Sequence, residues 1–544
     1  MRQAPNRIDA ITLEVLRNAI AAIADEMNAN LVRASYSPNI KERRDCSSAV
    51  FDAQGRMIAQ AESIPVHLGA MPYSVESAIQ HRSPFAPGDV VVLNDPYAGG
   101  AHLPDITFVV PVFMEDRLIA FVANRAHHAD VGGKEPGSLA GDTVEIYQEG
   151  LRIPPIRLWE REVLNDDLLQ MILANVRTPD ERWGDLRAQK AACATGIERM
   201  HALYLRVGKS VLLDAMSAVL DYSERRMRHQ ISQLPQGEAS FEDALDSDGI
   251  TEDVIPIRVR VKIEEERIEV DFSGTAEQVS GPVNAVFAVT ASAVYYAIRA
   301  FADPEIPPNS GCYRPITINA PEGSIVNACL PAPVVGGNLE TSQRIVDVVL
   351  GALGKLAPER SMAACQGSMN NLAIGGVDPL TGKAFTIYET IAGGFGGRAT
   401  KDGIDGIHSH MTNTLNTPVE ALETSYPLRV DRYELRPGTG GGGQYRGGLG
   451  IRRDMTCLAQ SARVSFLTDR RVTRPYGVEG GESGAPGQNA VIRNGEEFEL
   501  PSKGTTTLQY GDTISIRTPG GGGYGEIAKR DQKAVDRDVR EGRS

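Results

Sequence analysis

The spacing of apolar side chains predicts where the helices of this chain lie. Apolar residues recur at helical intervals over residues 11–33, which predicts that the chain begins with a long helix. The same spacing runs almost unbroken over residues 163–234, where the polar positions are rich in arginine and glutamate. This stretch predicts two or three long helices packed as a subdomain. Further helices are expected at 74–81, 283–301 and 338–353.

Continuous and alternating apolar runs predict strands. Residues 106–113 and 118–123 are two apolar runs on either side of Glu115 and Asp116, which predicts an antiparallel hairpin. Residues 254–263 and 267–274 alternate apolar with polar positions, as in a hairpin with one solvated face. Other strands are expected around a hairpin turn at 52–55, at 89–93, and in the glycine-rich part of the chain after about residue 362.

Together these elements predict an α+β, multidomain fold with mixed sheets, a helical subdomain and a β-rich C-terminal region. At 544 residues the chain exceeds the usual size of a single domain. Changes in composition divide it into an N-terminal α+β region with a metal site (1–160), a helical subdomain (161–235), a mixed α/β region (236–430), a β-rich glycine-loop region (431–530) and a charged tail, frayed or helical (531–544).

Composition narrows the classes of partner. The formal net charge of −14 argues against nucleic-acid binding, because phosphate neutralisation needs clustered lysine and arginine. The N-terminus lacks the apolar core of a secretory signal, and no apolar run approaches the roughly 18 residues that span a bilayer. The six cysteines are scattered, without CxxC spacing, which indicates reduced thiols. We therefore expect a cytoplasmic protein that binds no membrane.

The candidate chemistry lies at one end of the first predicted hairpin. His102 and Asp105 precede its first strand, while His127 follows its second strand. Antiparallel pairing places the start of the first strand beside the end of the second, so these three side chains are expected to converge. A histidine in a loop is usually a surface residue, but imidazoles and a carboxylate brought together are typical ligands of a divalent transition metal. The mixed nitrogen and oxygen set fits Zn, Mn or Fe better than Ca.

Two neighbours of His127 are expected to act beside the metal. His127 and His128 point to opposite faces of an extended segment, so only one is expected to be a ligand. We favour His127, which would lie on the same side as Ala123 and Arg125. His128 is then predicted to be catalytic or to face the substrate. Asp130 is predicted to be catalytic by orienting an imidazole, as carboxylates near metal-bound histidines do.

The segment KERRDCS places several charges in a loop after the first helix. A solvated charge run is the usual interpretation of such a segment. Asp45, however, lies between the first helix and a buried hairpin, where it could be a fourth metal ligand. Glu42 is assigned a catalytic role and Arg44 a substrate-binding role.

Three other histidines, and the glycine clusters, complete the candidates. His67, His408 and His410 lie between glycine, proline and asparagine residues and are assigned to substrate binding. The glycine clusters at 393–397, 440–443 and 520–523 are interpreted as tight turns and sites of close backbone approach. None of them has the GxxxxGK[ST] form of a nucleotide-phosphate loop.

Long motifs resemble a known family. They are ITLEVLRNAI, SYSPNIKERRDCS, IPVHLGAMP, NDPYAGGAHLPD, NRAHHADVGG, IYQEGLRIPP, ANVRTPDERWGDLRAQ, GGNLETSQR, GGFGGRATKDGIDGIHSHMTN and RPGTGGGGQYRGGLG. The chain is similar, from about residue 9 to about residue 525, to the hydantoinase B/oxoprolinase family. That family includes N-methylhydantoinase B subunits, the C-terminal half of 5-oxoprolinase and the α subunits of acetone carboxylases.

The resemblance implies a division of labour between two subunits. An A-type subunit binds ATP and phosphorylates the substrate, and the B-type subunit, which this chain resembles, holds a divalent metal and completes the reaction. The ligands of metal-containing relatives map to His102, Asp105 and His127, with a further carboxylate from KERRD, for which we prefer Asp45 over Glu42. One departure is Cys46, where the family pattern has an aromatic residue.

The function expected from this resemblance is that of a B-type subunit of an ATP-dependent cyclic-amide hydrolase, in a hetero-oligomer with a hydantoinase A-type subunit. The expected substrate is a hydantoin, 5-oxoproline or a related lactam. One competing function is the α subunit of an ATP-dependent ketone carboxylase, although 544 residues fit the hydrolase branch better. Another is a non-catalytic partner that only stabilises an A-type subunit.

Overall fold

A seven-stranded sheet carries the predicted hairpin near its centre. The computed structural model describes residues 8–61 and 63–543. Residues 1–7 and 62, in the predicted N-terminal region, and residue 544, in the predicted tail, lie outside the described residues. The sheet order is β2-β1-β5-β4-β3-β6-β7. Its strands are β1 (Cys46–Asp52), β2 (Met57–Gln60), β3 (Val90–Leu93), β4 (Asp105–Met114), β5 (Arg117–His127), β6 (Ile156–Glu160) and β7 (Val163–Leu164).

The β4–β5 hairpin is confirmed, and its turn follows from backbone geometry. Two residues, Glu115 and Asp116, join the strands, and both have positive φ angles, 49° and 59°. This is the arrangement of a type I′ turn, whose twist matches that of the flanking strands. Pairing runs from Met114 opposite Arg117 to Asp105 opposite His127.

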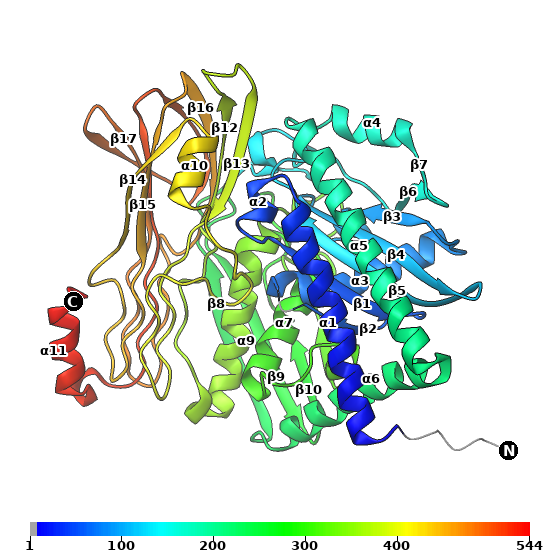
Figure 1. The fold of residues 1–544 in the computed structure, drawn as a ribbon. Helices are drawn as coiled ribbons and strands as arrows, with labels where there is room; N and C mark the ends of the chain where they lie inside the picture. Colours follow the sequence, from blue (N-terminus) through cyan, green and yellow to red (C-terminus); the bar gives the residue numbers. More distant parts are fainter. Residues whose placement is uncertain (1–7, 62, 544) are drawn as a thin grey trace.

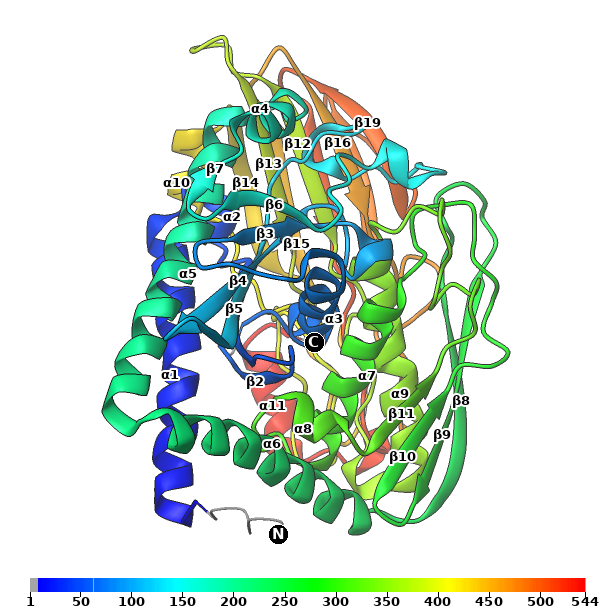
Figure 2. The same cartoon turned by 90° about the vertical axis from the view of Figure 1, so that its right-hand side faces the viewer.

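Helices cover both faces of this sheet, which explains why its strands are continuously apolar. The helices of the N-terminal half are α1 (Ala10–Ala34), α2 (Pro38–Lys41), α3 (Pro65–Arg82), α4 (Asp166–Ala174), α5 (Pro179–Val207) and α6 (Lys209–Ser232). Helices α1 and α5 pack against each other and on one face, where Val122 of β5 points. Helix α3 packs on the other face, against Phe121 (Figures 1 and 2). The long helices predicted for residues 11–33 and 163–234 are confirmed, except that Val163 and Leu164 form strand β7.

Helix α3 corrects one expectation. The apolar spacing predicted a short helix around residues 74–81, whereas the helix begins at Pro65. Proline is favoured at the first helical position, because its ring fixes a helical φ and its missing N–H has no helical partner to lose. His67 therefore lies on the first turn of a helix rather than in a loop.

A four-stranded sheet and three helices, one of them short, form the middle of the molecule. The sheet order is β11-β10-β9-β8, and the predicted β9–β10 hairpin with one solvated face is confirmed. The buried face of β9 packs on α9, which follows a π-helical turn at Gly337–Thr341. The elements are β8 (Gly237–Leu245), β9 (Ile255–Glu264), β10 (Arg267–Asp271), β11 (Ile316–Asn319), α7 (Phe287–Ala302), α8 (Ser310–Tyr313) and α9 (Ser342–Leu356).

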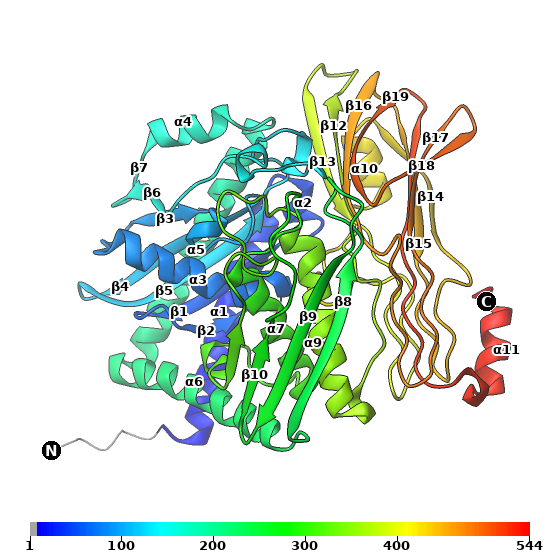
Figure 3. The ribbon, with the colours of Figure 1, turned by 180° about the vertical axis from the view of Figure 1, so that it is seen from behind.

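Two further sheets share an apolar core in the C-terminal part (Figure 3). Their orders are β13-β12-β16-β19 and β14-β15-β20-β17-β18. The elements are β12 (Asn371–Val377), β13 (Ala384–Thr390), α10 (Val419–Ser425), β14 (Leu428–Leu435), β15 (Ile451–Cys457), β16 (Ser461–Leu467), β17 (Gln488–Arg493), β18 (Glu496–Leu500), β19 (Lys503–Gln509), β20 (Thr513–Arg517) and α11 (Gln532–Arg540). Short 3-10 turns occur at Pro96–Ala98, Pro136–Ser138, Ile146–Gln148, Pro358–Arg360 and Ile527–Lys529.

The glycine clusters form long loops that run side by side between these sheets and α11 (Figure 1). A Cβ atom on Gly394 would lie 2.1 Å from the carbonyl oxygen of Gly448 and 2.2 Å from the amide nitrogen of Gly521. Only glycine permits backbones to approach this closely. The interpretation of the clusters as sites of close backbone approach is therefore confirmed.

A buried ion network joins the middle of the molecule to the C-terminal sheets. Arg344 of α9 lies 3.0 Å from Asp243 of β8 and 3.2 Å from Asp469, which follows β16. Arg470 lies 2.6 Å from Asp243 and 2.9 Å from Asp347 of α9. Buried charges require such mutual pairing, because an unpaired one costs several kcal/mol, about 3–5 kcal/mol when a partner is removed.

The predicted α+β class with mixed sheets and a β-rich C-terminal region is confirmed. The division into five parts stays a prediction. Among the described helices none is long and apolar enough to cross a membrane.

Gly196 tests the packing of α5 on the sheet. A Cβ atom there would lie 2.4 Å from Sδ of Met27 on α1 and 3.0 Å from Cγ1 of Val122 on β5. We expect Gly196→Val to destabilise the protein by about 1–3 kcal/mol through overpacking, measured as a lower thermal unfolding midpoint. Ala194→Val, at an exposed position of the same helix, is the matched control. Equal midpoints for the two variants would contradict this packing.

Candidate metal centre

Strand pairing brings together the three predicted ligands. Asp105 begins β4 directly opposite His127, the last residue of β5, and His102 lies in the turn before β4. The Nε2 atom of His102 is 3.2 Å from Nδ1 of His127. Oδ1 of Asp105 lies 3.2 Å from His102 Nε2 and 3.3 Å from His127 Nδ1. Ligand atoms of all three residues lie within 4.8 Å of one another.

Surrounding groups hold the two imidazoles in place. Nδ1 of His102 lies 3.3 Å from the carbonyl oxygen of Val335, which favours a proton on Nδ1 and leaves the Nε2 lone pair free. The His127 ring stacks on Tyr388 with centroids 4.5 Å apart. The backbone of His127 is held at both ends, since its N–H donates to the Asp45 carbonyl at 3.0 Å and its carbonyl accepts from Asn39 at 2.6 Å.

The electrostatics of the cluster favour a bound cation. Asp105 is fully buried, and neither of its carboxylate oxygens accepts a hydrogen bond within the described chain. Burial opposes its ionisation, but the nearby His102 and His67 hold the pKa of Asp105 well below its usual range. Burial lowers the pKa of His127, although its contact with Asp105 opposes the shift. An ionised buried carboxylate facing imidazole lone pairs is costly unless a cation compensates it. The donor set therefore fits a divalent transition metal.

His67 reaches this cluster from α3. Its Nε2 atom lies 3.3 Å from Oδ2 of Asp105 and 4.0 Å from Oδ1 of Asp45. Its Nδ1 atom is 3.1 Å from the hydroxyl of Ser47, and a hydrogen bond donated by that hydroxyl would leave the ring proton on Nε2, facing the carboxylates. His67 therefore lies where it can orient Asp105. Asp45 is also buried, but it is not one of the three residues whose ligand atoms lie within 4.8 Å of one another, so its role as fourth ligand stays a prediction.

His128 and Asp130, the predicted catalytic neighbours of His127, make hydrogen bonds that hold the backbone and helices in place. Nε2 of His128 is 2.9 Å from the side-chain oxygen of Gln189 on α5, and burial lowers the pKa of His128 to about 4. The carboxylate of Asp130 accepts from backbone N–H groups of Gly132, Gly137 and Arg177 and pairs with the Arg177 guanidinium at 2.9 Å. These contacts fix the loop after β5 and give no support to the catalytic roles.

In the KERRD segment Arg43 is buried, as Asp45 is. Its guanidinium donates to the carbonyl of Tyr388 at 2.9 Å and to the hydroxyl of Thr390 at 2.8 Å, and lies over the Tyr388 ring. Arg44 is exposed and Glu42 half-exposed at the end of α2, so their predicted roles gain no support from contacts. No pattern in the sequence distinguished Arg43 from Arg44, because Tyr388 and Thr390 lie more than 300 residues away along the chain.

His408 and His410 lie apart from the three-residue cluster. His408 is half-buried, and burial together with Arg43 lowers its pKa to about 4. His410 is buried, with Nε2 3.6 Å from Oδ1 of Asp347. Sequence reasoning missed Val335 and Tyr388, because nothing in their local sequence shows that they contact the cluster.

Comparison with known proteins assigns this chain to a family. The sequence profile of the hydantoinase B/oxoprolinase family matches residues 9–527. The chain is 44% identical to the uncharacterized protein MJ0963 of Methanocaldococcus jannaschii, over 98% of this chain and 94% of that protein. It is 37% identical to 5-oxoprolinase of Dictyostelium discoideum, over 95% of this chain but 40% of that protein. The chain therefore spans about two-fifths of the length of that relative.

A solved structure agrees with this placement. The ATP-dependent caprolactamase from Pseudomonas jessenii superposes with a TM-score of 0.92 and 30% sequence identity, over 99% of this chain and 95% of that chain. The chain belongs to the hydantoinase B/oxoprolinase family, and the resemblance found in its motifs is confirmed.

Metal analysis tests the cluster directly. We expect the purified protein to retain about one equivalent of a divalent transition metal through gel filtration, measured by mass spectrometry of the elements. His102→Ala removes an imidazole ligand and should abolish retention. His81→Ala, which changes an exposed histidine at the end of α3, is the control and should retain the metal. Equal metal content in the two variants would rule out the cluster as the binding site.

His67 provides a graded test. If His67 orients Asp105 without being a ligand, His67→Ala should weaken metal affinity by about 10- to 100-fold, the range typical of residues that hold metal ligands in position. Competition with a chelator of known affinity measures this change. Affinity equal to that of the unmodified protein would show that the contact of His67 with Asp105 is incidental.

Proposed function

We propose that this chain is the B-type subunit of an ATP-dependent hydrolase that opens cyclic amides. Hydantoin, 5-oxoproline and related lactams are the substrates that we consider. The observation that carries the proposal is the buried cluster of His102, Asp105 and His127. It occurs in a chain similar, over nearly its whole length, to an ATP-dependent caprolactamase.

Residues of this chain would hold the metal and position it. His102, Asp105 and His127 are the proposed ligands, with Asp45 as the fourth. A divalent metal bound there supplies a Lewis acid that activates water or polarises a carbonyl. Asp105 contributes the negative charge of the site, and the Val335 carbonyl fixes the His102 tautomer. The Tyr388 ring covers one face of His127 and shields it from water.

ATP chemistry is assigned to a separate A-type subunit. The chain has no GxxxxGK[ST] segment, and its sequence corresponds to 40% of the 5-oxoprolinase of Dictyostelium discoideum. We infer that an A-type partner supplies the ATP chemistry. The partner would phosphorylate the amide oxygen of the substrate, which makes the carbonyl carbon more reactive. This chain would then complete the hydrolysis of the activated intermediate.

Reconstitution tests the proposed function. With its A-type partner, the protein should hydrolyse ATP in a manner stimulated by hydantoin, 5-oxoproline or another lactam, and should release the ring-opened product. His102→Ala should lower product formation by about 1000-fold, since a metal contributes several kcal/mol of charge stabilisation. Complex formation should persist, because His102 is buried in this chain. Product is measured by chromatography and ATP turnover by phosphate release.

Two experimental outcomes would refute the proposed function, and each would indicate a different one. Turnover of a ketone with bicarbonate, and none of any cyclic amide, would identify a ketone carboxylase. A metal-free complex with full activity would show that this chain only stabilises its partner. His81→Ala should behave like the unmodified protein in both assays.

A further inference from the structure

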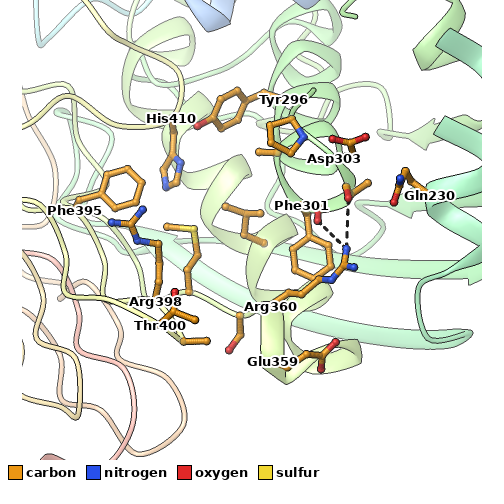
Figure 4. A pocket seen from close by; sticks show the side chains of 17 residues that line it. Gln230, Tyr296, Phe301, Asp303, Glu359, Arg360, Phe395, Arg398, Thr400 and His410 are labelled. Carbon is orange, nitrogen blue, oxygen red and sulfur yellow. Dashed lines mark hydrogen bonds between the residues drawn. The ribbon is translucent and has the colours of Figure 1, made fainter. Parts of the chain in front are cut away.

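A pocket separate from the metal cluster lies between the middle helices and the glycine loops. Its volume is about 720 Å³, and its walls come from α7, α9, the turn Pro358–Arg360 and the loop after β13. Figure 4 shows Phe395, Arg398 and His410 gathered on one side of the pocket, with Phe301 and Arg360 on the opposite side. None of the pocket residues belongs to the three-residue metal cluster.

One side of the pocket carries a cation without an anionic partner. The guanidinium of Arg398 donates to the backbone carbonyl of Asp402 at 3.3 Å and lies 5.1 Å from the centre of the Phe395 ring. Its Nε atom is buried and has no hydrogen-bond partner among the described residues. Asp303 also lines the pocket, but it pairs with Arg226 at 2.6 Å. Glu359 is exposed at the rim. The charge of Arg398 is therefore available to a ligand.

His410 is the second polar group on that side. It is 5% exposed, and neither ring nitrogen makes a hydrogen bond within the described chain. Its φ of 54° is uncommon for a residue other than glycine and is held by the surrounding packing. Its Nε2 atom lies 3.6 Å from Oδ1 of Asp347, which is too far for a hydrogen bond. A neutral imidazole protonates only one ring nitrogen, so the other is left as an unsatisfied acceptor.

Aromatic side chains form the rest of this wall. Tyr296 and Phe395 flank the His410 ring, with centroids 5.9 Å and 6.0 Å away. Phe301 stands across the pocket, beside Arg360, whose guanidinium is turned to the carbonyls of Phe301 and Ala302 at 3.4 Å (Figure 4). The pocket thus offers apolar surface around the Arg398 guanidinium and one free hydrogen-bond acceptor, with a second guanidinium, that of Arg360, on the opposite side.

We propose that this pocket binds a small organic carboxylate that also carries an N–H group. The carboxylate pairs with Arg398, the N–H donates to the unprotonated ring nitrogen of His410, and a short apolar body lies among Tyr296, Phe301 and Phe395. Opening a cyclic amide produces one carboxyl group and one amine or carbamoyl N–H, so the ring-opened product belongs to this class. The identification of the ligand with the ring-opened product rests on the proposed function. The binding of a carboxylate in this pocket does not.

One segment connects the pocket with the metal centre. His410 lines the pocket, and the next residue, Met411, accepts a backbone hydrogen bond from Val66, the neighbour of His67, at 3.2 Å. Further along, Leu415 donates to the carbonyl of Arg43 at 3.0 Å. Residues 410–415 therefore contact helix α3, which carries His67, and the loop after α2, which carries Asp45. A product released at the cluster would have a second site along the same segment.

Calorimetric titration of the whole chain tests the pocket. It is performed without ATP or partner, and with a chelator present so that a metal cannot bind the carboxylate. The probes are N-carbamoylglycine, glutamate and neutral hydantoin. We expect the two carboxylates to bind and hydantoin not to bind. Arg398→Gln should weaken carboxylate binding by about 10- to 100-fold, because a charge-assisted hydrogen bond is lost.

Matched variants separate this site from the metal cluster. Arg429→Gln changes an arginine on an exposed stretch of β14 and should bind like the unmodified protein, as should His102→Ala. Equal affinity of Arg398→Gln and the unmodified protein would overturn the proposal, as would loss of binding in His102→Ala alone. Inorganic phosphate that competes with equal affinity would also overturn it. Carboxylate binding in a protein that opens no cyclic amide would refute only the proposed function.

Discussion

The pairing of Asp105 with His127 across β4 and β5 is the constraint on which the candidate site depends. Side chains alternate between the faces of a strand, so a register shift of one residue would turn His127 away and bring His128 toward the cluster. The two-residue turn at Glu115 and Asp116 and the register shift between Val112 and Phe113 together set this register from the far end of the hairpin. Helices packed on both faces of the sheet fit the side chains of this register, since Val122 packs in the core under α1 and α5 and Phe121 packs against α3.

The cluster also depends on segments distant in sequence. Asp45 arrives from the loop after α2, His67 from α3, and Val335 from the loop before α9. Asp45 brings a carboxylate, His67 an imidazole ring and Val335 a backbone carbonyl. All three reach a buried region, where an unbalanced charge is costly. The site can thus form only after these elements have packed. The negative charge of the site then favours binding of a cation. In the proposed hydrolysis, that cation is the divalent metal.

The C-terminal sheets contribute to both sites rather than forming an independent unit. Tyr388 of β13 stacks on His127, while Phe395 and Arg398 from the following loop line the second pocket. The ion network around Arg344 holds these sheets against α9. The same network reaches the second pocket, because Asp347 lies 2.9 Å from Arg470 and 3.6 Å from His410.

The amino-acid sequence by itself determined the long helices, the hairpin, and the convergence of His102, Asp105 and His127. These depend on local periodicity and on a turn of two residues, both of which are visible in short windows. Only the tertiary structure decided that His67 faces Asp105, that Arg43 rather than Arg44 is buried, and that Arg398 and His410 share a pocket. Those contacts join residues far apart in the chain, and their energies depend on burial and on partners that no local pattern encodes.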